Sequence, residues 1–246
     1  MWFAAFICGV WLMTRIGRRD GLTDDQLTAM LFYVFFGTLI GARLGHCVFY
    51  EWGYYKDHLL EMILPVQFSP KFRITGYEGL ASHGAAIGIV VAMLLFARKI
   101  KKPFLWIMDR LCIVVALGGM FIRLGNFFNS EIIGKPTGSS FGVIFKRLGE
   151  DFPRHPAQLY EAFGYLILFF VLWVLYKKGY GQKVGFLFGI FLIALFTIRF
   201  VIEFFKENQV AFEDALPLNM GQLLSIPFIL AGGVILYFSQ KQSRKL

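Results

Sequence analysis

Residues 184–204 read VGFLFGIFLIALFTIRFVIEF, and no charged side chain precedes Arg199 in this stretch. A helix of this length rises about 30 Å, which is the thickness of the hydrocarbon core of a bilayer. The whole chain has the same character, because 57% of its residues are hydrophobic, only 17% are charged and the mean hydropathy is +0.60. Soluble domains carry about a quarter charged residues. The sequence therefore predicts an all-α protein embedded in a membrane.

Further apolar stretches are long enough to cross a bilayer. They lie at 29–50, 79–97, 104–122, 157–176 and 217–238. A shorter apolar run, Trp2–Met13, opens the chain without the charged region and cleavage site of a signal peptide. We interpret this run as the end of a first span whose beginning is missing. The prediction is one polytopic transmembrane domain over residues 1–246, a bundle of about seven helices.

The charges between the spans predict the orientation of the chain. Every second loop is basic, through Arg15, Arg18, Arg19, Arg98, Lys99, Lys101, Lys102, Lys177, Lys178, Lys183, Lys241, Arg244 and Lys245. The loop after the sixth span is acidic, with Glu207, Glu213 and Asp214 opposed only by Lys206. Because basic loops remain in the cytoplasm, we expect a cytoplasmic C-terminus and an N-terminus outside. Loops 51–78 and 123–156 then lie on the outer side.

Several classes of function are not supported by the sequence. The net charge of +9 does not indicate nucleic-acid binding, because the basic residues lie in short clusters between apolar runs. Cys8, Cys47 and Cys112 lie in apolar runs without ligand-like spacing, so we predict small buried hydrophobic residues. No metal-ligand spacing, phosphate-binding loop or dinucleotide fingerprint occurs, so neither a metal site nor a cofactor is predicted.

Ionisable side chains inside the predicted spans gather toward their outer ends, where each is a functional candidate. Arg123 lies in GMFIRLGNFFNSEIIG (119–134), where Asn126, Asn129 and Glu131 offer hydrogen bonds. A stretch this polar beside lipid must line a cavity or pack on protein. Guanidinium groups bind phosphate through paired, charge-assisted hydrogen bonds. These residues predict a membrane enzyme or transporter for an anionic, lipidic molecule.

Other polar positions extend this candidate site. Gln158 and Glu161 are three residues apart, so they share one face of the fifth span. Arg199 and Glu203 either form a buried ion pair, or Arg199 contacts a substrate. A histidine opens the glycine-flanked third span, either as a hydrogen-bond partner at the helix end or as a catalyst. We expect four cationic or titratable side chains to meet on the outer half of the bundle: Arg43, His83, Arg123 and Arg199.

Six stretches occur in an order and spacing typical of one known family. They are GARLGHCVFY (41–50), HGAAIG (83–88), IRLGNFFNSEIIGKPTG (122–138), RHPAQLYE (154–161), RFVIEFFKE (199–207) and MGQLLSIP (220–227). Through them the chain resembles the bacterial prolipoprotein diacylglyceryl transferases over nearly its whole length. The stretch around Arg123 is the most specific of the six.

The resemblance implies a seven-span fold in the bacterial cytoplasmic (inner) membrane. It also implies transfer of the diacylglyceryl group of phosphatidylglycerol to the lipobox cysteine of a prolipoprotein, with formation of a thioether and release of glycerol phosphate. In the family, residues matching Arg123 and Arg199 are associated with the lipid phosphate, and that matching His83 with catalysis. The predicted catalytic residues are therefore His83, Arg123 and Arg199. The predicted substrate-binding residues are Arg43, Arg123, Asn126, Asn129, Glu131, Gly134, His155, Gln158, Tyr160, Glu161, Arg199 and Glu203.

The main alternative is a transporter or channel for an anionic solute, with Arg123 and Arg199 along its path. Transporters often contain inverted repeats and helices interrupted near the midplane, whereas the two halves of this chain show no repeat. An assembly subunit without chemistry would not need so many arginine, histidine and asparagine side chains. The sequence favours the transferase, with phosphatidylglycerol, lipobox prolipoproteins and membrane lipids as partners and no nucleic acid.

Overall fold

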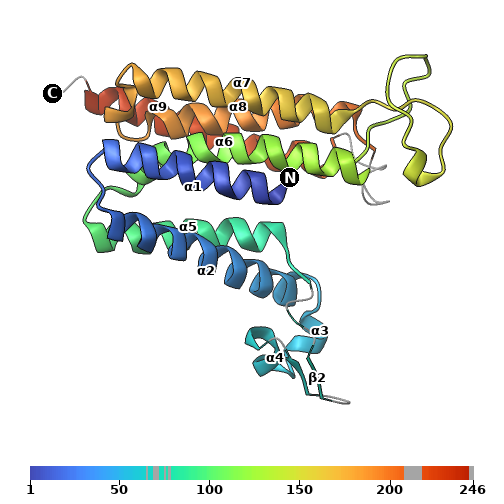
Figure 1. The fold of residues 1–246 in the computed structure, drawn as a ribbon, viewed down its shortest axis with the longest axis horizontal. Coiled ribbons are helices and arrows are strands. Elements are labelled where there is room, and N and C mark those ends of the chain that lie inside the picture. The colour runs from blue at the N-terminus through green and yellow to red at the C-terminus, as the bar shows by residue number, and fades with distance from the viewer. Residues whose placement is uncertain (65, 69–71, 75, 77–78, 208–217, 244–246) are drawn as a thin grey trace. The chain divides into compact units, whose positions relative to one another are not determined.

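The computed structural model describes residues 1–64, 66–68, 72–74, 76, 79–207 and 218–243, and most of them are helical (Figure 1). The long helices are α1 (Trp2–Arg19), α2 (Asp24–Phe49), α5 (Ser82–Ile100), α6 (Phe104–Asn129), α7 (Ala157–Lys177), α8 (Phe186–Ile202) and α9 (Met220–Ser243). The short elements are α3 (Trp52–Tyr55), α4 (Leu59–Ile63), the antiparallel strands β1 (Val66–Gln67) and β2 (Arg73–Ile74), and the 3₁₀ turns η1 (Lys146–Leu148), η2 (Tyr180–Gln182) and η3 (Glu203–Phe205).

Within the described part, six helices are long and apolar enough to cross a membrane: α2, α5, α6, α7, α8 and α9. The predicted polytopic helical fold is confirmed. The run Trp2–Met13 is also helical and continues to Arg19 as α1. Parts of the loop-charge argument, namely Glu213, Asp214, Arg244 and Lys245, lie outside the described residues.

One predicted boundary is wrong. Helix α6 continues to Asn129, past its expected end at residue 122, so Arg123 lies in the helix and not in an outer loop. The loop was expected to begin at residue 123 because the apolar stretch was taken to end at residue 122. Here Arg123 Nη1 donates a hydrogen bond to Asn126 Oδ1 at 3.2 Å, one helical turn further along. The polar groups therefore satisfy one another on the helix surface.

The described chain divides into two compact units, Gly17–Ile107 and Met1–Ile16 with Met108–Leu246. The second of these contains α6, α7, α8 and α9, with α8 packed against both α7 and α9. Its core is formed by apolar side chains of α1, α6, α7 and α8, namely Leu12, Ile16, Cys112, Ile113, Ala116, Leu168, Leu172, Tyr176, Leu187, Phe191 and Leu192. Cys47 and Cys112 are buried, as predicted, whereas Cys8 is only partly buried.

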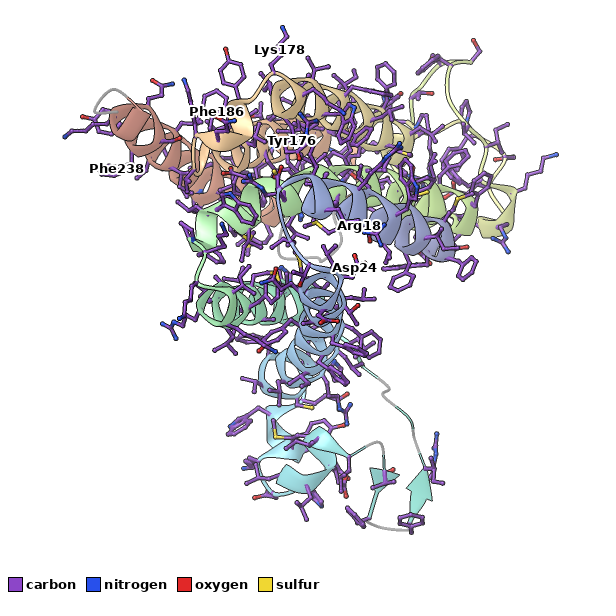
Figure 2. The ribbon with its side chains drawn as sticks, turned by 60° about the vertical axis from the view of Figure 1, so that its left-hand side comes forward. Arg18, Asp24, Tyr176, Lys178, Phe186 and Phe238 are labelled. Carbon is purple, nitrogen blue, oxygen red and sulfur yellow. The ribbon has the colours of Figure 1, made fainter. Side chains whose placement is uncertain are left out.

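A buried carboxylate connects α6 to the start of α8. Asp109 is 0% exposed and accepts hydrogen bonds from the backbone N–H groups of Gly185 at 2.7 Å and Phe188 at 2.9 Å. These donors belong to the first turn of α8, where backbone N–H groups lack helical partners and a negative charge is favoured. Figure 2 shows Tyr176 at the end of α7 and Phe186 at the start of α8. Asp109 therefore holds two spans together.

The unit Gly17–Ile107 is built on α2 and α5. Helix α2 starts with a capping box, in which Gln26 N donates to the Thr23 hydroxyl and Thr23 N donates to the Gln26 side chain. Just before it, Arg18 Nε lies 2.8 Å from Asp24 Oδ1 in an exposed ion pair (Figure 2). Helix α5 ends at Ile100 and is followed by Lys101, which has the left-handed conformation common at helix C-termini.

Glycines form the contact between α2 and α5. Gly37, Gly41 and Gly45 are spaced four residues apart on α2 and lie against Gly84 and Gly88 of α5. A Cβ atom added at Gly84 would lie 2.7 Å from the Gly45 Cα, and one added at Gly88 would lie 2.9 Å from the Gly41 Cα. Small residues at this spacing allow membrane helices to approach closely. We call these five residues the glycine seam.

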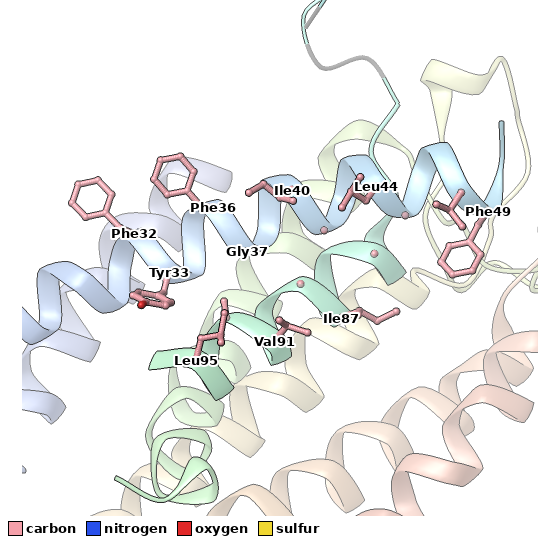
Figure 3. Close-up of a pocket in the computed structure, with 16 residues that line it drawn as sticks. Phe32, Tyr33, Phe36, Gly37, Ile40, Leu44, Phe49, Ile87, Val91 and Leu95 are labelled. Atoms are coloured by element: carbon pink, nitrogen blue, oxygen red, sulfur yellow. The ribbon is translucent and has the colours of Figure 1, made fainter. Parts of the chain in front are cut away.

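The glycine seam also forms the floor of an apolar groove of about 660 Å³ (Figure 3). Its walls carry larger side chains from both helices, among them Phe36 and Ile40 of α2 and Ile87, Val91 and Leu95 of α5. The seam provides no side chains to fill the space between these walls. Glycine therefore produces both the close helix contact and the groove beside it.

We predict that Gly88→Ala destabilises the protein by about 1–3 kcal/mol, because the new methyl group has no room at the seam. Gly118→Ala on α6 is the matched control, since a Cβ atom there meets nothing within 4 Å. Thermal unfolding in detergent measures both. Equal unfolding temperatures for the two variants would contradict the seam as a packing constraint.

Candidate functional site

The polar motif that ends α6 forms a connected hydrogen-bond network. Arg123 donates to Asn126, and Asn126 Nδ2 donates to Glu131 Oε2 at 2.7 Å. The other oxygen of Glu131 accepts from Asn129 Nδ2 at 3.2 Å. Four residues predicted for the substrate site are therefore brought together at one helix end.

The backbone turns sharply where α6 ends. Ser130 and Ile132 have φ values of 58° and 53°, which L-residues rarely adopt and which are most unfavourable for a β-branched side chain. Strained backbone of this kind persists where the surrounding contacts over-determine it, and it is common at functional sites. The turn places the Glu131 side chain back against the asparagines of α6.

Glu161 is the centre of the charged cluster. Its side chain is 0% exposed, and its Oε2 lies 2.8 Å from Arg123 Nε. Its other oxygen accepts a hydrogen bond from Lys206 Nζ at 2.9 Å, and the same ammonium donates to Glu203 Oε2 at 3.0 Å. A carboxylate this deeply buried requires cationic partners. The cluster connects α6, α7 and the turn that follows α8.

Gln158 and Glu161 lie on one face of α7, as predicted from their spacing. Gln158 is 0% exposed and its Nε2 donates to the backbone carbonyl of Glu131 at 2.6 Å. Its Oε1 is buried and accepts no hydrogen bond within the described residues. A buried acceptor without a donor is unfavourable, so a bound molecule with a hydroxyl group fits this position.

Of the two alternatives for Arg199 and Glu203, the buried ion pair is not present in the structure. Glu203 lies beyond the end of α8, in the η3 turn, and its carboxylate pairs with Lys206 instead. The Arg199 Nε atom is buried and has no hydrogen-bond partner in the part of the chain that the structure describes. Arg199, Arg123 and Glu161 all act electrostatically on the Tyr165 side chain, so they share one region.

Gly134, His155 and Tyr160 organise the segment beside this cluster. His155 Nδ1 lies 3.2 Å from the Tyr160 hydroxyl, and both rings pack against Phe205. A Cβ atom added at Gly134 would lie 2.8 Å from the Phe205 carbonyl oxygen. Only glycine therefore lets the turn after α6 approach the end of α8.

Two charged residues of this region were missed by sequence reasoning. Arg154 lies 2.6 Å from Glu150 and 2.7 Å from Glu207, and its guanidinium lowers the pKa of the Glu150 carboxyl. Lys206 had been counted as a loop charge, yet it is 3% exposed and ion-paired twice. Its spacing of three residues from Glu203 was the available signal.

Arg43 and His83 belong to the unit Gly17–Ile107. The Arg43 guanidinium donates to the backbone carbonyls of Met62 and Glu61 and to the Tyr55 hydroxyl, so it supports the segment after α2. His83 is exposed in the first turn of α5, and its ring forms no hydrogen bond with the described residues. Their expected meeting with Arg123 and Arg199 stays a prediction.

Comparison with known proteins identifies the family. The sequence model described as prolipoprotein diacylglyceryl transferase matches residues 1–238. The chain belongs to the prolipoprotein diacylglyceryl transferase family. This assignment confirms the resemblance noted in the sequence, and with it the transferase activity rather than transport.

Several relatives in this family are called phosphatidylglycerol–prolipoprotein diacylglyceryl transferase. The one from Bacteroides fragilis is 50% identical over 94% of this chain and 85% of its own length. The one from Tolumonas auensis is 44% identical over 99% of this chain and 93% of its own. The one from Chloroherpeton thalassium is 40% identical over 98% of this chain and 86% of its own.

We predict that Glu161→Gln lowers the free energy of unfolding by about 3–5 kcal/mol, because Arg123 then lacks its carboxylate partner and Lys206 keeps only Glu203. The control is Glu207→Gln, whose side chain is 45% exposed, so its loss should stay within about 1 kcal/mol. Denaturant titration in detergent measures both values. A Glu161→Gln protein as stable as the control would show that Glu161 does not hold the cluster.

Proposed function

We propose that this transferase takes phosphatidylglycerol as its donor and the lipobox cysteine of a prolipoprotein as its acceptor. The thiol sulfur attacks the carbon of the diacylglyceryl group that is bonded to the phosphate oxygen. The C–S bond forms, the C–O bond breaks with its electron pair on oxygen, and the thiol proton passes to a base. The products are a thioether and glycerol phosphate. The printed names of the relatives, which mention this lipid and prolipoproteins, support the choice of substrates.

The observation that carries this proposal is the buried Arg199 Nε, which has no hydrogen-bond partner among the described residues and lies beside a buried ionic cluster. A guanidinium in this situation suits a phosphodiester, which accepts two parallel hydrogen bonds from it. Positioned cations also stabilise the charge that develops on the leaving phosphate, and one such donor contributes about 10²–10³ in rate. Arg199 and Arg123 are our proposed phosphate ligands.

His83 is the proposed base. A thiol reacts as its thiolate, so attack on carbon requires removal of a proton near neutral pH. Imidazole is the side chain suited to that transfer. The ring of His83 is exposed and forms no hydrogen bond within the described part of the chain, which is compatible with this role. The alternative, a hydrogen-bond partner at the helix end, has less support for the same reason.

We further propose that the protein resides in the bacterial cytoplasmic membrane with its C-terminus in the cytoplasm and its N-terminus outside. The basic clusters at 98–102 and 177–183 support this orientation. Loops 51–78 and 130–156 then lie outside, together with the polar end of α6. Donor lipid and prolipoprotein would meet the enzyme at the outer face of that membrane.

The direct test is transfer by the purified protein. Phosphatidylglycerol in detergent micelles and a lipobox peptide are the substrates, and the same peptide with serine at the lipobox position is the control. A mass increase of the cysteine peptide by one diacylglyceryl group supports the proposal. No modification, while the lipid crosses vesicles that contain the protein, would support the transporter instead.

We predict that His83→Gln keeps phosphatidylglycerol binding but lowers turnover by about 10²-fold or more, because glutamine forms hydrogen bonds without accepting the proton. Raising the pH should partly restore turnover, since more thiolate then forms unaided. His58→Gln on the segment after α3 is the control and should keep full turnover. Lost lipid binding in His83→Gln, without rescue at high pH, would make His83 a headgroup ligand.

We predict that a cysteine at position 140 reacts with a membrane-impermeant reagent added outside the cell, whereas one at position 100 does not. The variants are Ser140→Cys and Ile100→Cys in a chain whose three native cysteines are replaced. Labelling before and after permeabilisation gives the comparison. The reverse pattern would overturn the orientation.

A further inference from the structure

Lys206 is the least expected member of the cluster, because a lysine is rarely buried so completely. It is 3% exposed, and its ammonium donates to Glu161 Oε1 at 2.9 Å and to Glu203 Oε2 at 3.0 Å. The backbone of Lys206 is also fixed by the turn after α6. Gly134 pairs with Lys206 in a β-bridge, and the Lys135 N–H donates to the Phe205 carbonyl at 2.8 Å. The ammonium is therefore presented to both carboxylates from a fixed position.

The cations of this cluster outnumber its buried carboxylates. Arg123, Arg199 and Lys206 bring three positive charges, and the buried Glu161 and Glu203 bring two negative charges. The Glu131 carboxylate nearby is exposed and accepts hydrogen bonds from Asn126 and Asn129. Arg123 and Lys206 are the cations that pair with carboxylates. The positive charge left over is that of Arg199, whose Nε has no partner within the described chain.

Glu203 would be the natural partner of Arg199 if Lys206 were absent. The two residues are four apart at the end of α8, the spacing at which helical side chains meet. Glu203 is held in another direction, with Lys206 on its Oε2 and Gly221 behind its carboxylate. A Cβ atom added at Gly221 would lie 2.6 Å from Glu203 Oε1, so the carboxylate rests directly on that glycine.

We propose that Lys206 is a positioning residue, which occupies Glu161 and Glu203 so that the Arg199 guanidinium remains available to an anionic phosphodiester. This inference rests on the proposed function, since the phosphodiester is the donor lipid. Without the ammonium, two carboxylates face each other in a low-dielectric site and attract the nearest cation. Arg199 then turns to Glu203, and the donor phosphate has to compete for it.

The test measures KM for phosphatidylglycerol and kcat at saturating lipobox peptide. We expect Lys206→Met to raise KM about tenfold or more, with a smaller change in kcat, because a charge-assisted hydrogen bond to phosphate is lost on binding. Lys206→Arg keeps the positive charge and should retain a KM close to that of the wild type. The matched control is Lys146→Met, an exposed lysine in η1, which should behave as wild type.

The double variant Lys206→Met/Glu203→Gln distinguishes a lysine that keeps Arg199 available from one that only stabilises the fold. It removes one charge of each sign, so Arg123 still pairs with Glu161 and Arg199 again has no competing carboxylate. Recovery of the low KM in the double variant supports the proposal, even if the single variant Lys206→Met does not fold. An unchanged KM in folded Lys206→Met, or a double variant with KM raised tenfold, would overturn it. Absence of transfer by the wild type would instead reject the proposed function.

Discussion

The buried carboxylate of Glu161 is the interaction on which the rest of the site depends. An isolated carboxylate in an apolar interior is unfavourable by several kcal/mol, so its burial is possible only with cations close by. Arg123 from α6 and Lys206 from the turn after α8 supply them, at 2.8 and 2.9 Å. One side chain of α7 therefore sets the positions of two neighbouring segments. The arginines cannot be understood separately from it.

The backbone around the cluster is built to hold it rigidly. Ser130 and Ile132 adopt left-handed φ values, and Gly134 lies against the end of α8 with no space for a side chain. Irregular backbone at the edge of a membrane is stable only where protein or a cavity satisfies its polar groups. Gln158 satisfies the Glu131 carbonyl, and β-bridges pair Gly134 with Lys206 and Pro136 with Arg154. A preorganised site of this kind loses little energy to rearrangement when an anionic lipid binds.

Particular residues show where sequence reasoning reached its limit. The third span was described as glycine-flanked, but the four-residue spacing of the glycines on both α2 and α5 was not interpreted as a helix contact. The spacing of Arg199 and Glu203 left both an ion pair and a substrate contact open. It could not show that α8 ends at Ile202 or that Glu203 pairs with Lys206 instead. The polar residues at the end of α6 were assigned to a loop. Side-chain hydrogen bonds stabilise these residues on a helix, and hydropathy does not report such bonds.

The sequence by itself determined the membrane class, the approximate spans, the family and most of the residues that gather around Glu161. The membrane class and the spans follow from the hydropathy of neighbouring residues, and the family and the site residues follow from short motifs. Both signals are local in the chain. Only the tertiary structure decided which charges pair. Lys206 meets Glu161 across 45 positions of sequence, and its donation to both carboxylates depends on where α7 and the end of α8 come together. Coulomb energy depends on the distance between charges in space, which spacing along the chain does not encode.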